Sequence, residues 1–236
     1  MDKKNENLFF NPEEISEMEK RTVDRIIEAI EAKDFDKAKK LTHRMYNEFL
    51  SMHDLYRNWV TSLLTEIGNR YGDQDLDAIM NESCKSWWRP IRLKMKQTSS
   101  ELKTQVKMFI SGLHGHLQPL EISEDIEKVT IKLKPCGSGG RLVQEGRYKG
   151  KNPFLTIKKG QKITYNRTNF PVYCAHEAAM ENVDFEDEGR PFVVVEPADK
   201  IGKDYCSFIC YKKEASVPKK YYERLGYKKP MRDTER

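Results

Sequence analysis

Apolar residues in the first 118 positions recur every three or four residues, which is the spacing of one face of an α-helix. Residues 11–14, with the sequence NPEE, supply an N-cap side chain, a proline in the first turn and two acids at the positive end of the helix dipole. Ile15, Met18, Thr22, Ile26 and Ile30 then follow at helical spacing. We therefore expect a helix that begins after Asn11 and continues to about Ile30.

Three further helices are predicted before residue 119. The second runs from about Asp36 to Gly72, and a third covers 75–88 and ends before Pro90, because proline disfavours the α conformation in the residue before it. Residues 98–101 (TSSE) have the spacing of a capping box ahead of a fourth helix at Leu102. In the second helix, the stripe expected to pack in the core is Met45, Phe49, Met52, Tyr56, Trp59, Leu63 and Ile67.

From about residue 119 the pattern changes to short β-type runs that glycine and proline interrupt. Residues 129–133 (VTIKL) alternate as a strand does and end in a tight turn at 135–140 (PCGSGG). A short helix is expected over 174–187 and two strands over 191–196 and 206–210, with 116–123 as the linker. We predict an α+β fold: a helical bundle domain (1–118) followed by a small mixed α/β domain with an antiparallel sheet (119–236).

Composition and charge narrow the classes of function. The chain has no run of about 18 apolar residues, and its charged N-terminus lacks the apolar stretch of a secretory signal, so we expect a cytoplasmic protein without a membrane partner. The net charge of +5 arises in residues 203–236, which hold 10 basic and 5 acidic side chains. Because nucleic-acid binders cluster basic residues on a recognisable motif, we expect no nucleic-acid partner. The oligomeric state stays open.

Cysteine and histidine in the second half point to a chemical site. Cys136 ends a strand beside a glycine turn, Cys174 and His176 lie at a predicted helix start, and Cys206 lies on the last strand. Amide dipoles at a helix start favour an anion and can lower a thiol pKa. Reduced thiols are expected because five cysteines are too sparse for a disulfide scaffold. Thiolate and imidazole prefer zinc and other thiophilic transition metals, so we predict a metal site at Cys136, Cys174, His176 and Cys206.

Two other interpretations of the thiols stay open. One cysteine can act as a nucleophile or redox group without a metal, or the thiols can be structural, since cysteine often packs as a small hydrophobic residue. Cys210, within the sequence FICY, and Cys84, beside Trp87 and Trp88, are the expected core residues.

The predicted catalytic side chains are Glu177, His176 and Arg141. Glu177 directly follows His176, and Glu181 lies one helical turn further on, so either acid can exchange protons near the metal or can belong to a solvated helix surface. Arg141 follows the glycine turn and is suited to bind a substrate carboxylate with two hydrogen bonds.

The remaining histidines receive no firm role from the sequence. His114 and His116 lie at the predicted domain junction, where ligand pockets are common. His53 shares a helix face with Tyr56 and Arg57 and is expected to be structural.

Residues 170–211, which contain YCAHEAAMENVDFEDEGRPFVVVEP and CSFICY, resemble the C-terminal part of two groups of small α+β domains. These are the 4-vinyl reductase-like domains and the L-2-amino-thiazoline-4-carboxylate hydrolase-like proteins. The resemblance implies small-molecule binding, metal-holding cysteines in some members and, for the second group, ring-opening hydrolysis. It implies that Cys174 and Cys206 are the site positions. The PCGSGGRL segment and the helical half lie outside it.

These patterns predict a metal-assisted enzyme of the hydrolase type, with zinc or another thiophilic metal, acting on a small polar organic molecule. The alternative is a small-molecule or metal-sensing module whose thiolates form a closed structural site. A third possibility is an interaction scaffold without chemistry. Coordination separates the first two, because a catalytic zinc ion keeps an open position and a structural one does not.

Overall fold

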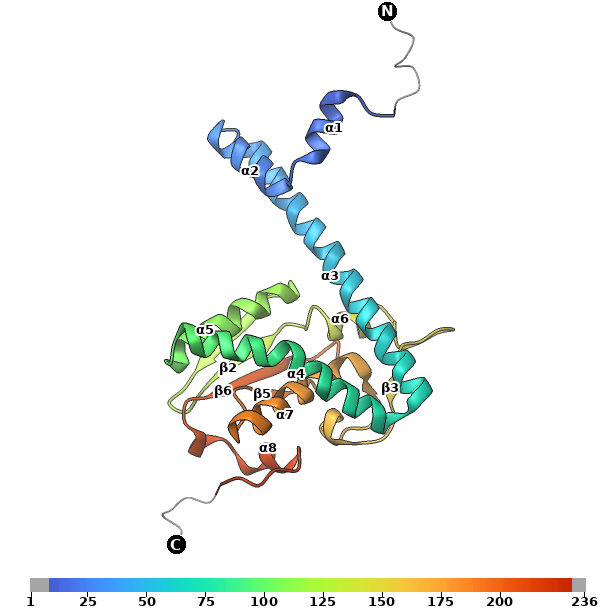
Figure 1. Ribbon diagram of the computed structural model, residues 1–236, viewed down its shortest axis with the longest axis vertical. Helices are drawn as coiled ribbons and strands as arrows, with labels where there is room; N and C mark the ends of the chain where they lie inside the picture. Colours follow the sequence, from blue (N-terminus) through green and yellow to red (C-terminus); the bar gives the residue numbers. More distant parts are fainter. Residues whose placement is uncertain (1–8, 231–236) are drawn as a thin grey trace, which may run out of the picture. The chain divides into compact units, whose positions relative to one another are not determined.

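The computed structural model describes residues 9–230, which fall into two compact units, and the chain passes from one to the other after Leu55. The helix α3 (Phe35–Tyr71) contributes residues to both units (Figure 1). The change of texture at residues 118/119 does not coincide with this division, because the helices α4 (Asp73–Thr98) and α5 (Leu102–Leu113) share a hydrophobic core with the sheet that follows them.

The N-terminal unit consists of α1 (Pro12–Glu19), α2 (Thr22–Glu31) and the first part of α3. The predicted cap is confirmed: the Asn11 side chain accepts a hydrogen bond from the amide of Glu14 (2.8 Å), and the Glu14 carboxylate accepts one from the amide of Asn11 (2.9 Å). The single helix predicted to Ile30 is wrong, since the chain is extended at Lys20 and Arg21. Apolar spacing does not reveal this break because α2 continues the same periodicity.

The core stripe predicted for α3 is also wrong. In the N-terminal unit Met45, Phe49 and Met52 are exposed, and the buried apolar side chains are only Ala29, Ala38 and Leu41 among the residues described. In the larger unit the exposed members of the stripe are Tyr56, Trp59 and Leu63, whereas Ile67 packs against the core. A helical period reports that a face is apolar and does not report whether another element covers it.

The larger unit combines helices with a four-stranded antiparallel sheet, so the predicted α+β fold is confirmed (Figure 1). The strand order is β1-β2-β6-β5, and a second, two-stranded sheet pairs β3 with β4. The strands are β1 (Leu120–Glu124), β2 (Lys128–Leu133), β3 (Thr156–Ile157), β4 (Phe170–Pro171), β5 (Val194–Glu196) and β6 (Cys206–Tyr211). The α-helices after α5 are α6 (Gly139–Gln144), α7 (His176–Glu188) and α8 (Lys219–Glu223), with 3-10 turns η1 (His114–His116), η2 (Lys162–Thr164), η3 (Val172–Ala175) and η4 (Glu214–Ser216).

Several predicted boundaries differ from the structure. α4 continues through Pro90 to Thr98, because burial of Trp88 and Arg92 on its inner face outweighs the hydrogen bond that proline removes. The capping box at 98–101 does not form: Glu101 is the N-cap of α5, and its side chain makes no capping bond. The expected linker overlaps β1, and the last two residues of the expected PCGSGG turn already belong to α6, which starts at Gly139.

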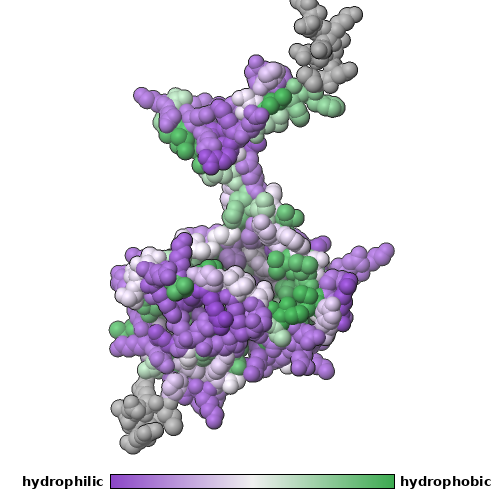
Figure 2. Space-filling view, viewed as in Figure 1, coloured by the Kyte–Doolittle hydropathy of each residue, from purple (hydrophilic) through white to green (hydrophobic). Residues whose placement is uncertain are grey.

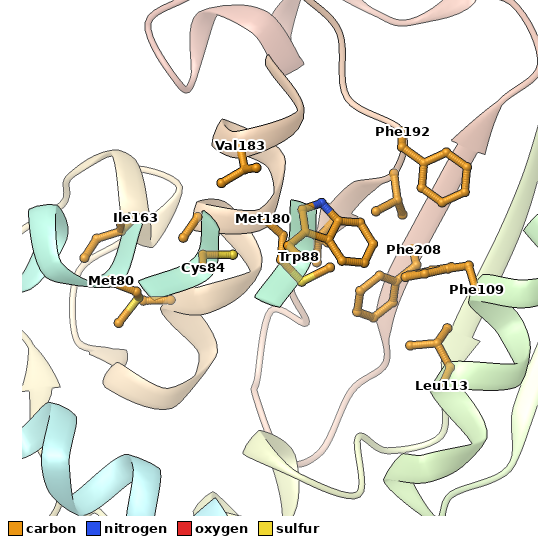
Figure 3. Packing of buried hydrophobic residues seen from close by; sticks show 14 of the residues in the cluster. Met80, Cys84, Trp88, Phe109, Leu113, Ile163, Met180, Val183, Phe192 and Phe208 are labelled. Carbon is orange, nitrogen blue, oxygen red and sulfur yellow. The ribbon is translucent and has the colours of Figure 1, made fainter. Parts of the chain in front are cut away.

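The core of the larger unit lies between the sheet and the helices α4, α5 and α7. Trp88 packs edge-on against Phe109 with ring centroids 6.2 Å apart, and Phe109 lies 5.7 Å from Phe208 of β6 (Figure 3). Cys84 and Cys210 are 1% exposed in this core, so their predicted packing role is confirmed. No helix within residues 9–230 combines the length and apolar character that crossing a membrane requires.

Two buried carboxylates fix α7 in the fold. Asp184 accepts hydrogen bonds from the indole Nε1 of Trp88 (3.0 Å), from Arg92 Nε (3.3 Å) and from the amide of Phe192 (3.1 Å). It therefore joins α7 to α4 and to the segment before β5.

Glu181, three residues earlier on α7, binds a different set of neighbours. It accepts hydrogen bonds from the amide of Val195 (2.7 Å), from Arg224 Nη2 (2.7 Å) and from the hydroxyl of Tyr165 (3.2 Å). Glu181 is 0% exposed, so it is a structural acid and not part of a solvated surface.

Burial raises the pKa of Glu181 to about 7, although Arg224 opposes the shift. A carboxyl group whose pKa is raised in the folded state adds stability below its unfolded pKa, and this contribution is lost as the pH rises through its folded pKa. Glu181 should therefore lower the free energy of unfolding between pH 5 and about 7.5, by at most about 1.4 kcal/mol per pH unit for one proton. Chemical denaturation at half-unit pH steps measures this slope.

The substitution Glu181→Gln should flatten the slope in this pH window, because the amide does not titrate. Glu124→Gln serves as the control, since Glu124 pairs with Lys212 at an exposed edge and its pKa is lowered. If Glu181→Gln and wild type keep the same slope, the carboxyl group of Glu181 does not titrate in this range.

Candidate functional site

Three cysteines from three separate segments line one cavity. Cys136 lies between β2 and α6, Cys174 lies in η3 directly before α7, and Cys206 begins β6. The antiparallel register pairs Leu133, the last residue of β2, with Cys206, so the loop that carries Cys136 leaves the sheet at the end where β6 begins. His176, the first residue of α7, lines the same cavity. The structure thus brings together all four residues predicted as metal ligands.

The cavity is small and mostly apolar. Its volume is about 30 Å³, which is room for about two water molecules or a single ion. Apolar walls come from β2, β4, β5 and β6, through Leu133, Phe170, Val195 and Phe208. A polar ligand of several heavy atoms does not fit inside it, whereas one ion surrounded by sulfur atoms does.

The glycines of the PCGSGG segment allow the close packing around this cavity. A Cβ atom on Gly139 would lie 2.5 Å from the sulfur of Cys174, and one on Gly137 would lie 1.9 Å from the carbonyl oxygen of His116. No side chain can be added at either position without moving these neighbours. The glycine turn therefore brings the segments of Cys136, Cys174 and His116 together.

Backbone amides point at two of the three sulfur atoms. The amide of Ser138 donates to Cys136 Sγ (3.4 Å), and the amides of Gly139 and Gly140 also act on this thiol. The amide of Ala198 donates to Cys206 Sγ (3.4 Å). Successive amides make an anion-binding concavity, and here the concavity surrounds a cysteine of the chain itself.

Burial controls the protonation of the thiols. It raises the pKa of Cys206 to about 12 and the pKa of Cys174 well above its ordinary value, and it outweighs the backbone amides at Cys136, whose pKa is raised as well. The lowered pKa expected for Cys174 from its place at a helix start is therefore wrong. Without a bound cation, all three groups are protonated at neutral pH.

Two imidazoles and a carboxylate border the thiol cavity. The Nδ1–H of His176 donates to the carbonyl oxygen of Tyr173, which directs Nε2 toward the Glu177 carboxylate 3.3 Å away. Burial lowers the pKa of His176, but the charge and hydrogen bond of Glu177 outweigh it, so the pKa of His176 is raised. His116 Nδ1 lies 2.7 Å from the hydroxyl of Ser138. Acid–base groups are therefore available beside the sulfur atoms.

A larger pocket adjoins the thiol cavity. Its volume is about 370 Å³, and it shares His116, His176, Glu177 and Phe208 with the smaller cavity. Most of its other walls are apolar and come from α4 and α5. The shared residues therefore stand between a sulfur-lined interior and an open apolar pocket.

Other predicted residues do not line this cavity. Arg141, on α6, pairs with Glu145 (3.3 Å between Nε and Oε1) and is not among the residues that line the cavity. His114 is exposed on η1, and His53 lies 3.4 Å from Asp54 in the N-terminal unit.

Local sequence patterns contain only a weak signal for His116 and Ser138, which border the cavity. His116 stood out as half of a His-Gly-His segment, and its contact with Ser138 joins residues 22 positions apart. No local pattern reports a contact of that range.

Within residues 9–230, no group of three or more histidine, cysteine, aspartate or glutamate side chains is already arranged to hold a metal ion. Comparison with protein-family models, with curated proteins and with solved structures gave no match. The interpretation of the site therefore rests on its own residues.

Replacement of Gly139 by alanine should disturb the site directly, because the new methyl group would overlap the sulfur of Cys174. We expect Gly139→Ala to lower the free energy of unfolding by about 1–3 kcal/mol, as overpacking does, and to increase alkylation of Cys174. Denaturant titration and peptide mass spectrometry after brief alkylation measure the two effects.

Gly112→Ala is the matched control. Gly112 lies in α5 with no atom within 4 Å of an added Cβ, so this change should leave the stability unchanged or raise it by up to about 1 kcal/mol. Equal stability of the Gly139→Ala variant and wild type would contradict the close packing at Cys174.

Proposed function

We propose that this chain binds a thiophilic metal ion, zinc or another transition metal, through Cys136, Cys174 and Cys206, and that it is a metal-assisted enzyme of the hydrolase type. The observation that carries the proposal is the convergence of these thiols, from three segments, on one cavity of ionic size bordered by His176 and Glu177. Cysteines that only fill a core need no cavity. Cys84 and Cys210 are of that kind, since they are buried in the hydrophobic core and do not line the site.

The donor set fits a soft metal ion. Three thiols with an adjacent imidazole are the ligand types that zinc prefers, and the amides directed at Cys136 and Cys206 favour the anionic form of sulfur. The side chains are not yet arranged around a common centre, so binding requires the sulfur atoms to approach one another. Rotation about the cysteine χ1 bonds is the smallest movement that changes their positions.

The thiol pKa values favour a metal site over a free nucleophile. An activated cysteine requires a lowered pKa, whereas burial raises the pKa of all three thiols here. A metal ion displaces thiol protons when it binds, and its charge offsets the cost of burying thiolates. We therefore expect metal uptake to release protons.

The rim residues supply the remaining chemistry in this proposal. A bound zinc ion would act as a Lewis acid toward a substrate carbonyl or water. The bond from His176 Nδ1–H to the Tyr173 carbonyl leaves Nε2 either to complete the ligand set or to exchange protons together with Glu177. The ligand is a small organic molecule that enters through the larger pocket. A site of reduced thiols also fits a cytoplasmic location.

The alternative is a metal- or small-molecule-sensing module in which four protein ligands close the site. His176 is the available fourth ligand in that case, and the cavity volume of about 30 Å³ favours such a compact arrangement. The two functions differ in whether an external ligand reaches the metal.

Metal content tests the proposal. Wild type purified under reducing conditions and loaded with zinc should hold about one ion per chain, as in a single thiolate site, by mass spectrometry after gel filtration. Cys136→Ala, Cys174→Ala and Cys206→Ala should each lose most of it, because two sulfur donors hold zinc poorly. Cys210→Ala is the control on the same strand and should retain the ion.

Cobalt substitution separates an enzyme from a sensor. With cobalt in the site, thiolate absorption should appear in wild type and in Cys210→Ala, and added azide should shift the spectrum if one position is open. An unshifted spectrum would favour the closed, sensing site. Folded wild type that takes up neither metal, with all its thiols titratable, would refute the metal site.

A further inference from the structure

The 370 Å³ pocket beside the thiol cavity has the composition of a binding site for an apolar molecule. α4 contributes Trp87, Ile91 and Met95, which lie four residues apart on one helix face, and α5 contributes Met108 and Leu113. The volume is at the small end of the range for organic ligands.

Part of this apolar surface is open to solvent. Trp87 is 38% exposed and Ile91 is 41% exposed, although both line the pocket, whereas the adjacent Trp88 is 2% exposed. Covering large apolar side chains in a concave site with an apolar ligand removes their surface from water, which favours binding. The walls therefore favour a ligand whose main part is hydrophobic. The small polar molecule expected from the sequence would suit only the end of the pocket beside His176 and Glu177.

Polar groups lie at two separated places in the pocket. His116, His176 and Glu177 form the inner end, and the ring centroid of Trp87 lies 6.4 Å from that of His176. Lys94 also lines the pocket, seven residues beyond Trp87 on α4, which corresponds to about 10 Å along the helix axis. Lys94 is exposed and makes no ion pair with any residue in the described part of the chain.

We propose that the pocket binds an aryl carboxylic acid whose ring lies against Trp87 and Ile91 and whose carboxylate pairs with Lys94. A separation of about 10 Å along α4 suits one aromatic ring with a short side chain. The end of the molecule opposite the carboxylate then faces His176 and Glu177. This assignment rests on the proposed function only for the reaction at His176 and Glu177, and binding of the ligand does not depend on it.

Titration of the metal-free protein with 3-phenylpropionate, followed by ligand-observed NMR, tests the assignment. Saturable binding is expected, with 3-phenylpropanol weaker and propionate without measurable binding. Trp87→Ala should weaken 3-phenylpropionate at least about tenfold, as loss of a central aromatic contact does. Lys94→Gln should weaken it about three- to fivefold, the size of an exposed ion pair, and should leave 3-phenylpropanol unchanged.

Lys96→Gln is the matched control, because Lys96 pairs with Glu188 (2.8 Å) and does not line the pocket. Equal affinity for propionate and 3-phenylpropionate, or no saturable binding to wild type, would overturn the assignment. Cys174→Ala should still bind 3-phenylpropionate. Wild type that binds 3-phenylpropionate but takes up no metal would refute the metal site alone. Wild type that takes up metal but does not bind 3-phenylpropionate would refute the pocket assignment alone.

A second inference rests on a separate observation, the small core of the N-terminal unit. Its hydrophobic cluster consists of Ala29, Ala38 and Leu41, with Ile26 packed against it. Larger apolar side chains on its three helices remain exposed, and hydrophobic colour shows at the surface of these helices in Figure 2. Eight of them are Ile15, Met18, Val23, Ile27, Ile30, Met45, Phe49 and Met52. A helical unit of this size rarely folds on so small a core without a partner.

The exposed positions have the spacing of a helix–helix interface. Val23, Ile27 and Ile30 on α2, and Met45, Phe49 and Met52 on α3, each follow a four-then-three interval. This 3.5-residue repeat is the one that packs helices side by side. A large side chain buries roughly 200 Å², and about half of that is left to bury on each of these eight. Together they would bury about 800 Å² of surface per chain, which is the size of a standard interface.

Charge distribution favours a second copy as the partner. α1 carries acids at Glu13, Glu14, Glu17 and Glu19 and no base, whereas residues 37–44 of α3 carry Lys37, Lys39, Lys40 and Arg44 and no acid. In a two-fold dimer, a contact between the acidic α1 of one chain and the basic segment of the other forms twice. We infer that two copies associate through this unit into a helical bundle.

Light scattering after gel filtration at about 50 µM, a concentration well above the Kd of a specific interface of this size, tests the inference. Wild type should have twice the mass of one chain, and the double variant Phe49→Glu with Met52→Glu should have the mass of one. Ile126→Glu is the control, because Ile126 is 91% exposed in the larger unit and lies outside the proposed interface. A wild-type monomer, or a double variant that stays dimeric, would overturn the inference.

Discussion

Two buried carboxylates on α7 hold the larger unit together. Asp184 binds Trp88 and Arg92 of α4, and Glu181 binds Val195 of β5 and Arg224. A carboxylate removed from water is costly unless several donors surround it, and each of these has at least three. α7 is therefore placed by directional bonds as well as by apolar packing, and the site depends on it because α7 begins with His176 and Glu177.

The thiol cavity depends on a different constraint, the close approach of three backbone segments. Gly137 and Gly139 allow the turn after β2 to lie against His116 and Cys174, and the sheet register brings Cys206 to the same end. The result is a set of sulfur atoms protonated in the absence of a cation and supplied with amide donors that favour thiolate. This combination is suited to a group that exchanges protons for a metal ion.

The proposed metal site and the apolar pocket complement each other. The inner cavity has room for an ion but not for an organic molecule. The pocket has room for a small organic ligand, and few of the side chains that line it are polar. His116, His176 and Glu177 belong to both. A molecule that fills the pocket would present one end to the imidazoles and the carboxylate, which is the arrangement that acid–base chemistry requires.

The sequence by itself determined the features that depend on neighbouring residues. These are the cap at Asn11, the helical and sheet-forming halves, and the place of Cys136 beside a glycine turn, because capping, periodicity and turn chemistry act over a few residues. Only the tertiary structure decided which apolar faces are covered, so that Met45 and Phe49 are exposed although their spacing is that of a core stripe.

The tertiary structure also decided the roles of the polar residues. Glu181 became a structural acid, His116 joined the site, and the pKa of Cys174 rose. Each depends on contacts with residues distant in the chain or on burial, and neither quantity is present in a local pattern of residue types.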